Sequence, residues 1–332
     1  MNTHNENTIE NSWEIFSKNI QKYQASNLRK SSWQIIDTFV PYLGLWVLIV
    51  YSLSVSWWLS LFLILLAAGF LVRLFIIFHD CGHGSFFKSE TSNKIVGMLF
   101  GILAFTPYYA WHNQHLKHHA TVGNLDKRGV GDVWTLTKEE YQQSSRLTRI
   151  KYRFYRNPVV MFGVGSLYVF LIQNRLTKKG MSLKEKRNIY FTNVALTLIF
   201  AIMSRIIGFA EFLIIQLLIL YFASIAGLWL FYLQHQYEEV SWVRNKDWNF
   251  RNIAIHGSSY VKLPKLLQWF SGNIGFHHIH HINARIPNYN LAKCYRENEV
   301  FRAVKPVTFL RSLKSLSLRL WDEKMQKMVS FR

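Results

Sequence analysis

Four long apolar segments dominate this chain and restrict what it can fold into. They lie at about residues 39–57, 59–78, 189–209 and 212–233, and each is an almost uninterrupted run of hydrophobic and aromatic residues. At about 1.5 Å per residue, helices of this length cross the hydrocarbon core of a bilayer. The connections near Trp57 and Ala210 are very short. The sequence therefore predicts an all-α integral membrane protein whose four main transmembrane helices form two hairpins.

Basic residues flank these segments. The formal net charge of the 332-residue chain is +20. Because the basic residues lie beside apolar spans, we expect them to interact with anionic lipid headgroups rather than with nucleic acid. Residues 117–187 carry the basic stretches RLTRIKYRFYRN and RLTKKGMSLKEKR, whereas the hairpin tips carry little more than Arg205. By the positive-inside rule, the N-terminus, the middle region and the C-terminal third are expected in the cytoplasm, with the protein in the plasma membrane.

Two shorter apolar runs, at residues 95–109 and 159–172, are short for a spanning helix. If either crossed the bilayer alone, the histidine-rich segments of the chain would lie on opposite faces of the membrane and could not meet. We expect both runs to be interfacial or re-entrant helices, with a matched pair of short crossings as the alternative. One domain, residues 1–332, is predicted, with a cytoplasmic helical cap formed by residues 79–188 and 234–332. The polar start MNTHNENTIENSWEIF does not have the pattern of a secretory signal peptide.

Most of the 13 histidines lie in three clusters, HDCGH, HLKHH and HHIHH. Residues three or four apart share one helical face, so each cluster presents its imidazoles to one side. Another histidine follows the last span in FYLQHQYEE. If the parity of the spans is right, nine histidines meet at one membrane surface: His79, His83, His115, His118, His119, His235, His277, His280 and His281.

Nine imidazoles are too many for one ion and divide naturally between two, which predicts a reactive dinuclear centre. Imidazole suits zinc, copper, iron and nickel, and a structural zinc site would be closed by four ligands. His112 and His278 are expected to be surface residues or to act behind the ligands, because His278 lies about 100° round the helix from His277. His4 and His256 are interpreted as packed or solvated side chains.

The three clusters resemble the histidine boxes HxxxH, HxxHH and HxxHH of the integral-membrane fatty-acid desaturases. The stretches RLFIIFHDCGHGSFF, NLDKRGVGDVWTLT and GSSYVKLPKLLQWFSGNIGFHHIHH are similar to bacterial acyl-lipid desaturases, most of all to the Δ5-type phospholipid desaturases of bacilli. The resemblance covers nearly the whole chain from about Asn27. It implies that the nine histidines bind two iron ions, which with O₂ desaturate the acyl chains of membrane phospholipids and so contribute to membrane fluidity and unsaturated fatty acid biosynthesis.

The chain shows no dinucleotide fingerprint, no CxxC cluster and no HPGG haem motif. No bound organic cofactor is therefore predicted, and the resemblance implies ferredoxin or flavodoxin as the electron donor. A related membrane di-iron hydroxylase or ketolase, acting on an alkane, a lipid or a carotenoid, is the alternative that the boxes leave open. A metal transporter is disfavoured, because the four spans contain no acid or histidine at mid-depth.

Residues around the boxes supply further expectations. Asp80, next to a proposed ligand, and Asp126 or Asp132 are candidates to accept a ring N–H. For Asp126 and Asp132, pairing with Arg128 or Lys127 on a solvated loop is the favoured role. Animal stearoyl-type desaturases have an Asn one turn before the histidine after the last span; here that position is Phe231, and Asn273 could supply the oxygen or cap a helix. Four aromatic residues could line an acyl tunnel, although an interfacial aromatic belt is the favoured role for each: Phe86, Tyr108, Trp111 and Phe276.

Overall fold

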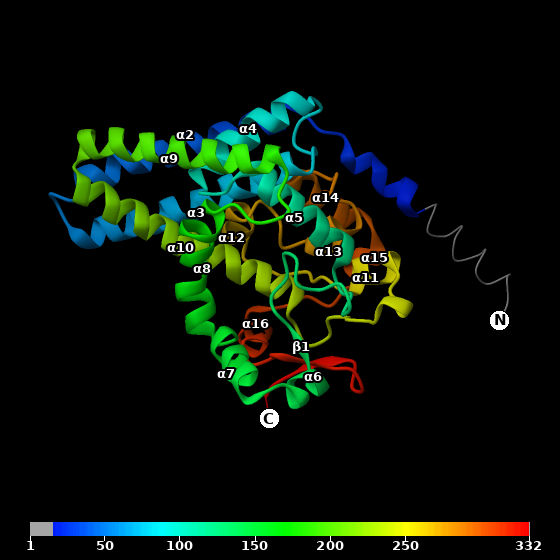
Figure 1. Cartoon of the computed structure of the whole chain (residues 1–332). Helices are drawn as coiled ribbons and strands as arrows, with labels where there is room; N and C mark the ends of the chain where they lie inside the picture. Colours follow the sequence, from blue (N-terminus) through cyan, green and yellow to red (C-terminus); the bar gives the residue numbers. More distant parts are fainter. Residues whose placement is uncertain (1–15, 332) are drawn as a thin grey trace.

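The computed structural model describes residues 16–331. The polar start of the chain up to residue 15, and with it His4, lies outside the described residues. The chain is mostly helical, and four of its helices are long and apolar enough to cross a membrane. These are α2 (Leu28–Ser52), α3 (Trp57–Gly82), α9 (Leu183–Ile207) and α10 (Phe209–His235). They form the two expected hairpins and lie together at one end of the molecule (Figure 1).

The long helices extend beyond the predicted spans at their polar ends. Helix α2 begins eleven residues before residue 39, and its first turn is capped by Asn27, whose side chain accepts a hydrogen bond from the backbone N–H of Lys30. Helix α9 begins with a capping box formed by Ser182 and Glu185. Because caps satisfy the free N–H groups of a first turn, both helices can continue past the apolar region.

The two short apolar runs form bent helices. Residues 95–109 are divided between α4 (Glu90–Leu103) and α5 (Tyr108–Thr121), which meet at 101°. Residues 159–172 form the π-helix η2 (Val159–Gly165) and α8 (Ser166–Leu171), followed by η3 (Gln173–Arg175). This second run bends by 67° from α7 (Arg146–Tyr155). If each bent pair counted as one span, the described chain would have up to six.

Shorter elements form the rest of the molecule, which lies at the other end and below the bundle in Figure 1. The helices are η1 (Lys22–Gln24), α6 (Lys138–Gln143), η4 (Asn245–Asp247), α11 (Phe250–His256), α12 (Lys265–Phe270), α13 (His277–Ile282), α14 (Asn288–Glu297), α15 (Glu299–Arg302) and α16 (Phe309–Ser315). A small sheet, which the sequence did not predict, has the order β1 (Leu136–Thr137), β2 (Leu320–Asp322), β3 (Lys327–Val329). Strand β2 pairs parallel with β1 and antiparallel with β3.

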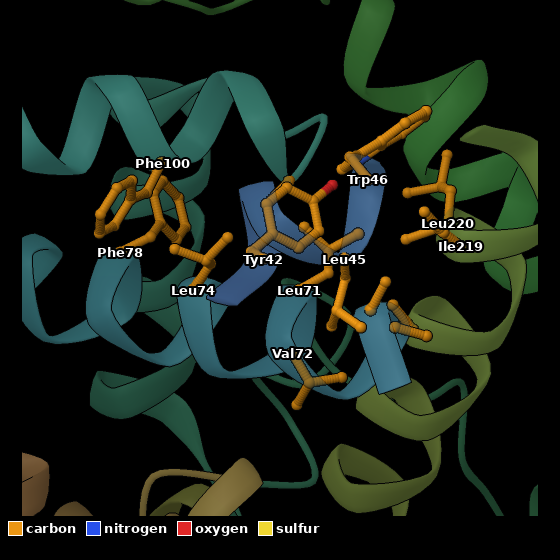
Figure 2. Packing of buried hydrophobic residues seen from close by; sticks show 14 of the residues in the cluster. Tyr42, Leu45, Trp46, Leu71, Val72, Leu74, Phe78, Phe100, Ile219 and Leu220 are labelled. Carbon is orange, nitrogen blue, oxygen red and sulfur yellow. The ribbon is translucent and has the colours of Figure 1, made fainter. Parts of the chain in front are cut away.

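Helix α3 is the centre of the largest core cluster. Its buried side chains pack against α2, α4 and α10. Figure 2 shows Phe78 with Phe100 at one side of this cluster and Ile219 with Leu220 at the other, with Tyr42 and Leu71 between them. Helix α10 of the second hairpin packs directly on α3. The last turn of α3, which carries His79, is therefore held in a fixed position relative to the end of α10.

We predict that Gly101→Ala destabilises the fold. A Cβ atom at Gly101 would lie 2.6 Å from the backbone oxygen of Thr106 and 3.0 Å from the ring of Phe78, so the turn between α4 and α5 would have to shift, at about 1–3 kcal/mol. Thermal unfolding of the purified protein in detergent measures this. Gly44→Ala on α2 is the matched control, because its Cβ would meet nothing within 4 Å. An equal loss in both variants would contradict the packing argument.

Candidate metal centre

Four helices deliver histidines to one place. His79 is in the last turn of α3 and His83 caps it; His235 ends α10. The second box lies on α5 and the third on the short helix α13. Because α4 and α5 turn back by 101°, α5 stays at the same side of the bundle as the ends of α3 and α10.

The nine histidines predicted as ligands form two groups, and within each group the candidate ligand atoms lie within 4.8 Å of one another. The group of five contains His79, His83, His115, His119 and His280. The group of four contains His118, His235, His277 and His281. The structure thus divides the histidines between two positions, and it leaves His112 and His278 out of both groups.

The second and third boxes each supply three histidines, and these are divided between the two groups. His115 and His119, which are four residues apart, join the group of five, while His118 between them joins the group of four. In the third box the division is reversed, since His277 and His281 join the group of four and His280 the group of five. The helical spacing predicted one shared face. Instead, α5 and α13 each point a pair to one position and a single imidazole to the other, so each group draws on both helices.

The distances between ring nitrogens suit bound ions. In the group of five, His115 Nε2 lies 3.0 Å from His79 Nε2, and His280 Nε2 lies 3.0 Å from His119 Nε2. An ion about 2.1 Å from two imidazole nitrogens at a right angle would hold those nitrogens about 3.0 Å apart. In the group of four, His277 Nε2 lies 3.0 Å from the Nε2 atoms of both His235 and His281.

The contact between His118 and His235 is not an ordinary hydrogen bond, because of where the ring protons lie. His118 Nδ1 lies 2.7 Å from Asp132 Oδ1, and His235 Nδ1 lies 3.2 Å from the carbonyl oxygen of Gly257. Both acceptors require a proton on Nδ1, and an imidazole whose single proton is on Nδ1 has only a lone pair at Nε2. Yet the two Nε2 atoms are 3.1 Å apart. A cation between them removes the repulsion, and the donor set therefore fits a metal ion.

Burial keeps the imidazoles neutral. Burial, reinforced by the neighbouring histidines, holds the pKa of His277, His280 and His281 well below the ordinary value. A neutral imidazole is the form that binds metal. His83 Nε2 is likewise buried and has no hydrogen-bond partner among the described residues, as expected of an atom that faces an ion.

Two buried carboxylates, Asp80 and Asp132, each contact the Nδ1 atom of one histidine in the groups. Asp80 Oδ1 lies 3.2 Å from His79 Nδ1. Its other oxygen, Oδ2, accepts hydrogen bonds from the backbone N–H and the side-chain Nδ2 of Asn288, at 2.7 and 2.8 Å. The sequence indicated Asp80 because it adjoins a proposed ligand. Nothing in the sequence indicated Asn288, which lies 208 positions away and holds the carboxylate toward His79.

The role favoured for Asp132 was wrong, and the alternative, a contact with a histidine ring, is what the structure shows. Asp132 does not pair with Arg128 or Lys127 on a solvated loop. Its side chain is 4% exposed and faces His118, while its second oxygen accepts a hydrogen bond from the backbone N–H of Gly129. Fourteen residues separate Asp132 from His118, and no helical spacing relates them.

Asp126 is a partly solvated loop residue, as expected, but with a different partner. It pairs with Arg244 at 2.8 Å, while Arg128 pairs with Glu140. The N-cap of α13 is Phe276, so Asn273 does not cap that helix. Asn273 has a left-handed φ of 59° and donates from its side chain to the carbonyl of Asn288.

The aromatic neighbours of the boxes lie inside the protein. Phe86, Tyr108 and Phe276 are buried, so the expectation that they form an interfacial belt was wrong. Trp111 stacks on the ring of His115 with 4.4 Å between centroids. Phe231 contacts the rings of His118 and His235. His278 is fully buried among the rings of Tyr260, Tyr295 and Phe301, rather than at the surface.

The fold and the site define a class of protein: a multi-pass helical membrane protein with two groups of histidines at one end of its bundle, one group buried and the other partly buried. The chain belongs to the fatty acid desaturase family, whose profile matches residues 55–309. It is 46% identical to a fatty acid desaturase of Bacillus subtilis, over 98% of this chain and 93% of that protein. It is 29% identical to an sn-1 acyl-lipid omega-3 desaturase (ferredoxin) of Synechocystis sp., over 70% of this chain and 64% of the relative. An sn-1 oleoyl-lipid 12-desaturase of Synechocystis sp. is 25% identical, over 76% of this chain and 70% of the relative.

We predict that Asp132→Asn weakens metal binding by about 10- to 100-fold, because it removes the charge that orients and polarises His118. Metal retained against a graded series of chelator concentrations measures the change. Asp126→Asn is the matched control, since this nearby carboxylate contacts Arg244 and no histidine. The same loss in both variants would show that loop integrity, and not the contact with His118, sets the affinity.

We predict that His278→Phe makes the metal-free protein less sensitive to acid. Burial lowers the pKa of His278 to about 3, whereas an unfolded histidine titrates near 6.5. The unfolded chain therefore binds the extra proton first, and stability falls as the pH drops below about 6.5. At pH 5 the loss is about 2 kcal/mol. The loss of unfolding free energy between pH 8 and pH 5 should therefore be about 2 kcal/mol smaller in His278→Phe than in the unchanged protein. It should be unchanged in His256→Phe, since His256 is exposed.

Proposed function

We propose that this protein is an acyl-lipid desaturase that introduces a double bond, at Δ5, into the acyl chains of membrane phospholipids. The reaction uses O₂, two iron ions held by the nine histidines, and electrons from reduced ferredoxin or flavodoxin. The protein resides in the plasma membrane with its histidines toward the cytoplasm. The observation that carries the proposal is the pair of histidine groups at the ends of α3 and α10, in a chain of the fatty acid desaturase family.

The reaction breaks two C–H bonds on adjacent methylenes and forms a C=C bond. The two hydrogens, two electrons from the donor and two further protons reduce one O₂ to two waters. Bound iron supplies the one-electron and O₂ chemistry that no amino-acid side chain offers. The chain itself contributes the positions of nine imidazoles, the orientation of His79 by Asp80 and of His118 by Asp132, and an environment in which six of the nine rings are buried and three are partly buried.

An apolar space for a hydrocarbon chain lies within the bundle. A cavity of about 450 Å³ is lined by α2, α4, α9 and α10, with Leu103, Leu196, Ile199 and Phe200 among its walls. A membrane-embedded space of this kind supports an acyl substrate that stays in the bilayer. The Δ5 position rests on the resemblance to Δ5-type desaturases, since the relatives named above carry omega-3 and 12 specificities in their names.

Two observations support the proposed electron donor and orientation. One relative is named as a ferredoxin-using enzyme. The basic stretches flanking the spans favour the cytoplasmic face for the histidines, which is also the side where a soluble acidic donor would meet a positive surface.

We predict that a host lacking unsaturated fatty acids will gain a new double bond in its phospholipids when it expresses this chain, and that the purified protein will contain about two irons. Mass spectrometry with double-bond localisation measures the product, and metal analysis measures the iron. His277→Ala should lose iron and product, because its Nε2 faces two other imidazoles. His256→Ala, on an exposed residue of α11, is the control. Hydroxylated or keto products in place of a double bond would contradict the proposal and support the hydroxylase or ketolase alternative.

A further inference from the structure

A second cavity, outside the histidine groups, opens beside the first turns of α2. It has a volume of about 510 Å³ and lies between α2, α3, α12 and α14. Four cationic side chains and one carboxylate line it: Lys30, Arg73, Lys265, Arg296 and Asp37. Buried Arg73 and partly buried Asp37 form an ion pair, with 3.5 Å between Nη2 and Oδ1, which neutralises two of these charges. The remaining three are positive, so the cavity favours an anion.

The mouth of this cavity lies at the edge of the membrane. The apolar run of α2 begins at residue 39, so Lys30 and Asp37 precede the hydrocarbon region. Helix α12 packs against α3 and exposes Leu266 and Leu267, 66% and 51% accessible, directly after Lys265. Trp33, also on the cavity wall, is 65% exposed. Apolar side chains beside cations are the pattern of a surface that meets lipid headgroups.

Two of the cations are available for a ligand. Lys265 and Arg296 are exposed, and the ion pairs of the described part of the chain include neither of them. Arg73, by contrast, is buried and engaged with Thr38, the carbonyl of Trp269 and Asp37. Lys30 donates to Asn290 at 3.2 Å. Exposed Lys and Arg side chains on either side of a cavity are suited to a phosphate group.

The floor of the cavity is connected to the group of five histidines. Asn288 lines the cavity, accepts a hydrogen bond from Gln34 Nε2 at 2.9 Å and donates to Asp80, which contacts His79. Gln34 is buried, and its Oε1 has no hydrogen-bond partner among the described residues. The cavity and a proposed metal ligand thus share one chain of polar contacts.

We infer that this cavity binds the phosphodiester headgroup of a glycerophospholipid, with Lys265 and Arg296 on the phosphate and the acyl chains directed into the bilayer. The inference rests on the proposed function in that it gives the phospholipid substrate a fixed place beside the histidines. It explains how a substrate without a soluble carrier is held: the headgroup stays at the membrane surface while the chain remains among the apolar helices. Headgroup recognition then sets which lipids are substrates.

The first test measures binding and needs no turnover. Purified full-length protein in detergent is titrated with short-chain phosphatidylglycerol and with the diacylglycerol of the same chains, and native mass spectrometry gives the affinities. We expect preference for the phosphate-bearing lipid and a weakening of about 30-fold in the Lys265→Gln/Arg296→Gln double variant. Lys178→Gln/Lys179→Gln is the control, because it removes two exposed cations from the loop before α9. Equal affinity for both lipids, or equal weakening in both double variants, would overturn the inference.

The second test separates the cavity from the reaction. In the Lys265→Gln/Arg296→Gln variant, the half-saturating concentration of phospholipid should rise about 30-fold while turnover at saturation and iron content stay unchanged. Desaturation of diacylglycerol should be unaffected. Loss of iron, or an equal effect on both lipids, would contradict headgroup binding. Selective phospholipid binding without desaturation of any lipid would support the cavity and refute the proposed function instead.

Discussion

Repulsion between neutral imidazoles is the constraint on which the rest of this structure depends. His118 and His235 have acceptors at Nδ1, so their Nε2 lone pairs face each other at 3.1 Å. Burial holds the pKa of His277 and His281 well below the ordinary value, which favours the neutral, metal-binding form of these rings. The arrangement is unfavourable without a cation and favourable with one. A scaffold that holds such rings together must be rigid, and α3, packed on α2, α4 and α10, provides that rigidity.

The membrane hairpins are the means by which sequence-distant histidines reach one surface. Helices α3 and α10 each carry a histidine in the last turn, His79 and His235. Each is the second helix of its hairpin, so the two histidines lie at the same end of the bundle. The 101° bend between α4 and α5 then keeps the second box at that end. The sharp turn places Phe105 at φ 53°, a left-handed conformation that non-glycine residues rarely adopt. Holding all boxes on one side thus requires local backbone strain as well as an even number of crossings.

The sequence predicted those features that depend on local pattern. Uninterrupted apolar runs located the interiors of four spans, and i, i+4 spacing located helical histidines. It could not predict how the boxes divide between two groups, because the division of His118 from His119 depends on how α5 faces α13. Asp132 was misinterpreted for the same reason, since its contact with His118 is made by a loop without periodicity. Asn288 was missed because its partner Asp80 lies 208 positions earlier.

Two buried carboxylates, Asp80 and Asp132, lie beside the two groups of histidines. Asp80 and the side chain of Asp132 are 2% and 4% exposed. Among the described residues, each forms an ion pair with a histidine and with no Lys or Arg. An isolated buried carboxylate is expensive, so such groups are normally paired or lie near a metal. Here each histidine group has one carboxylate, separated from its centre by a single imidazole ring. The negative charges are placed where two cations would balance them, so the loop carrying Asp132 and the first residue of α14, Asn288, support the same two groups of histidines.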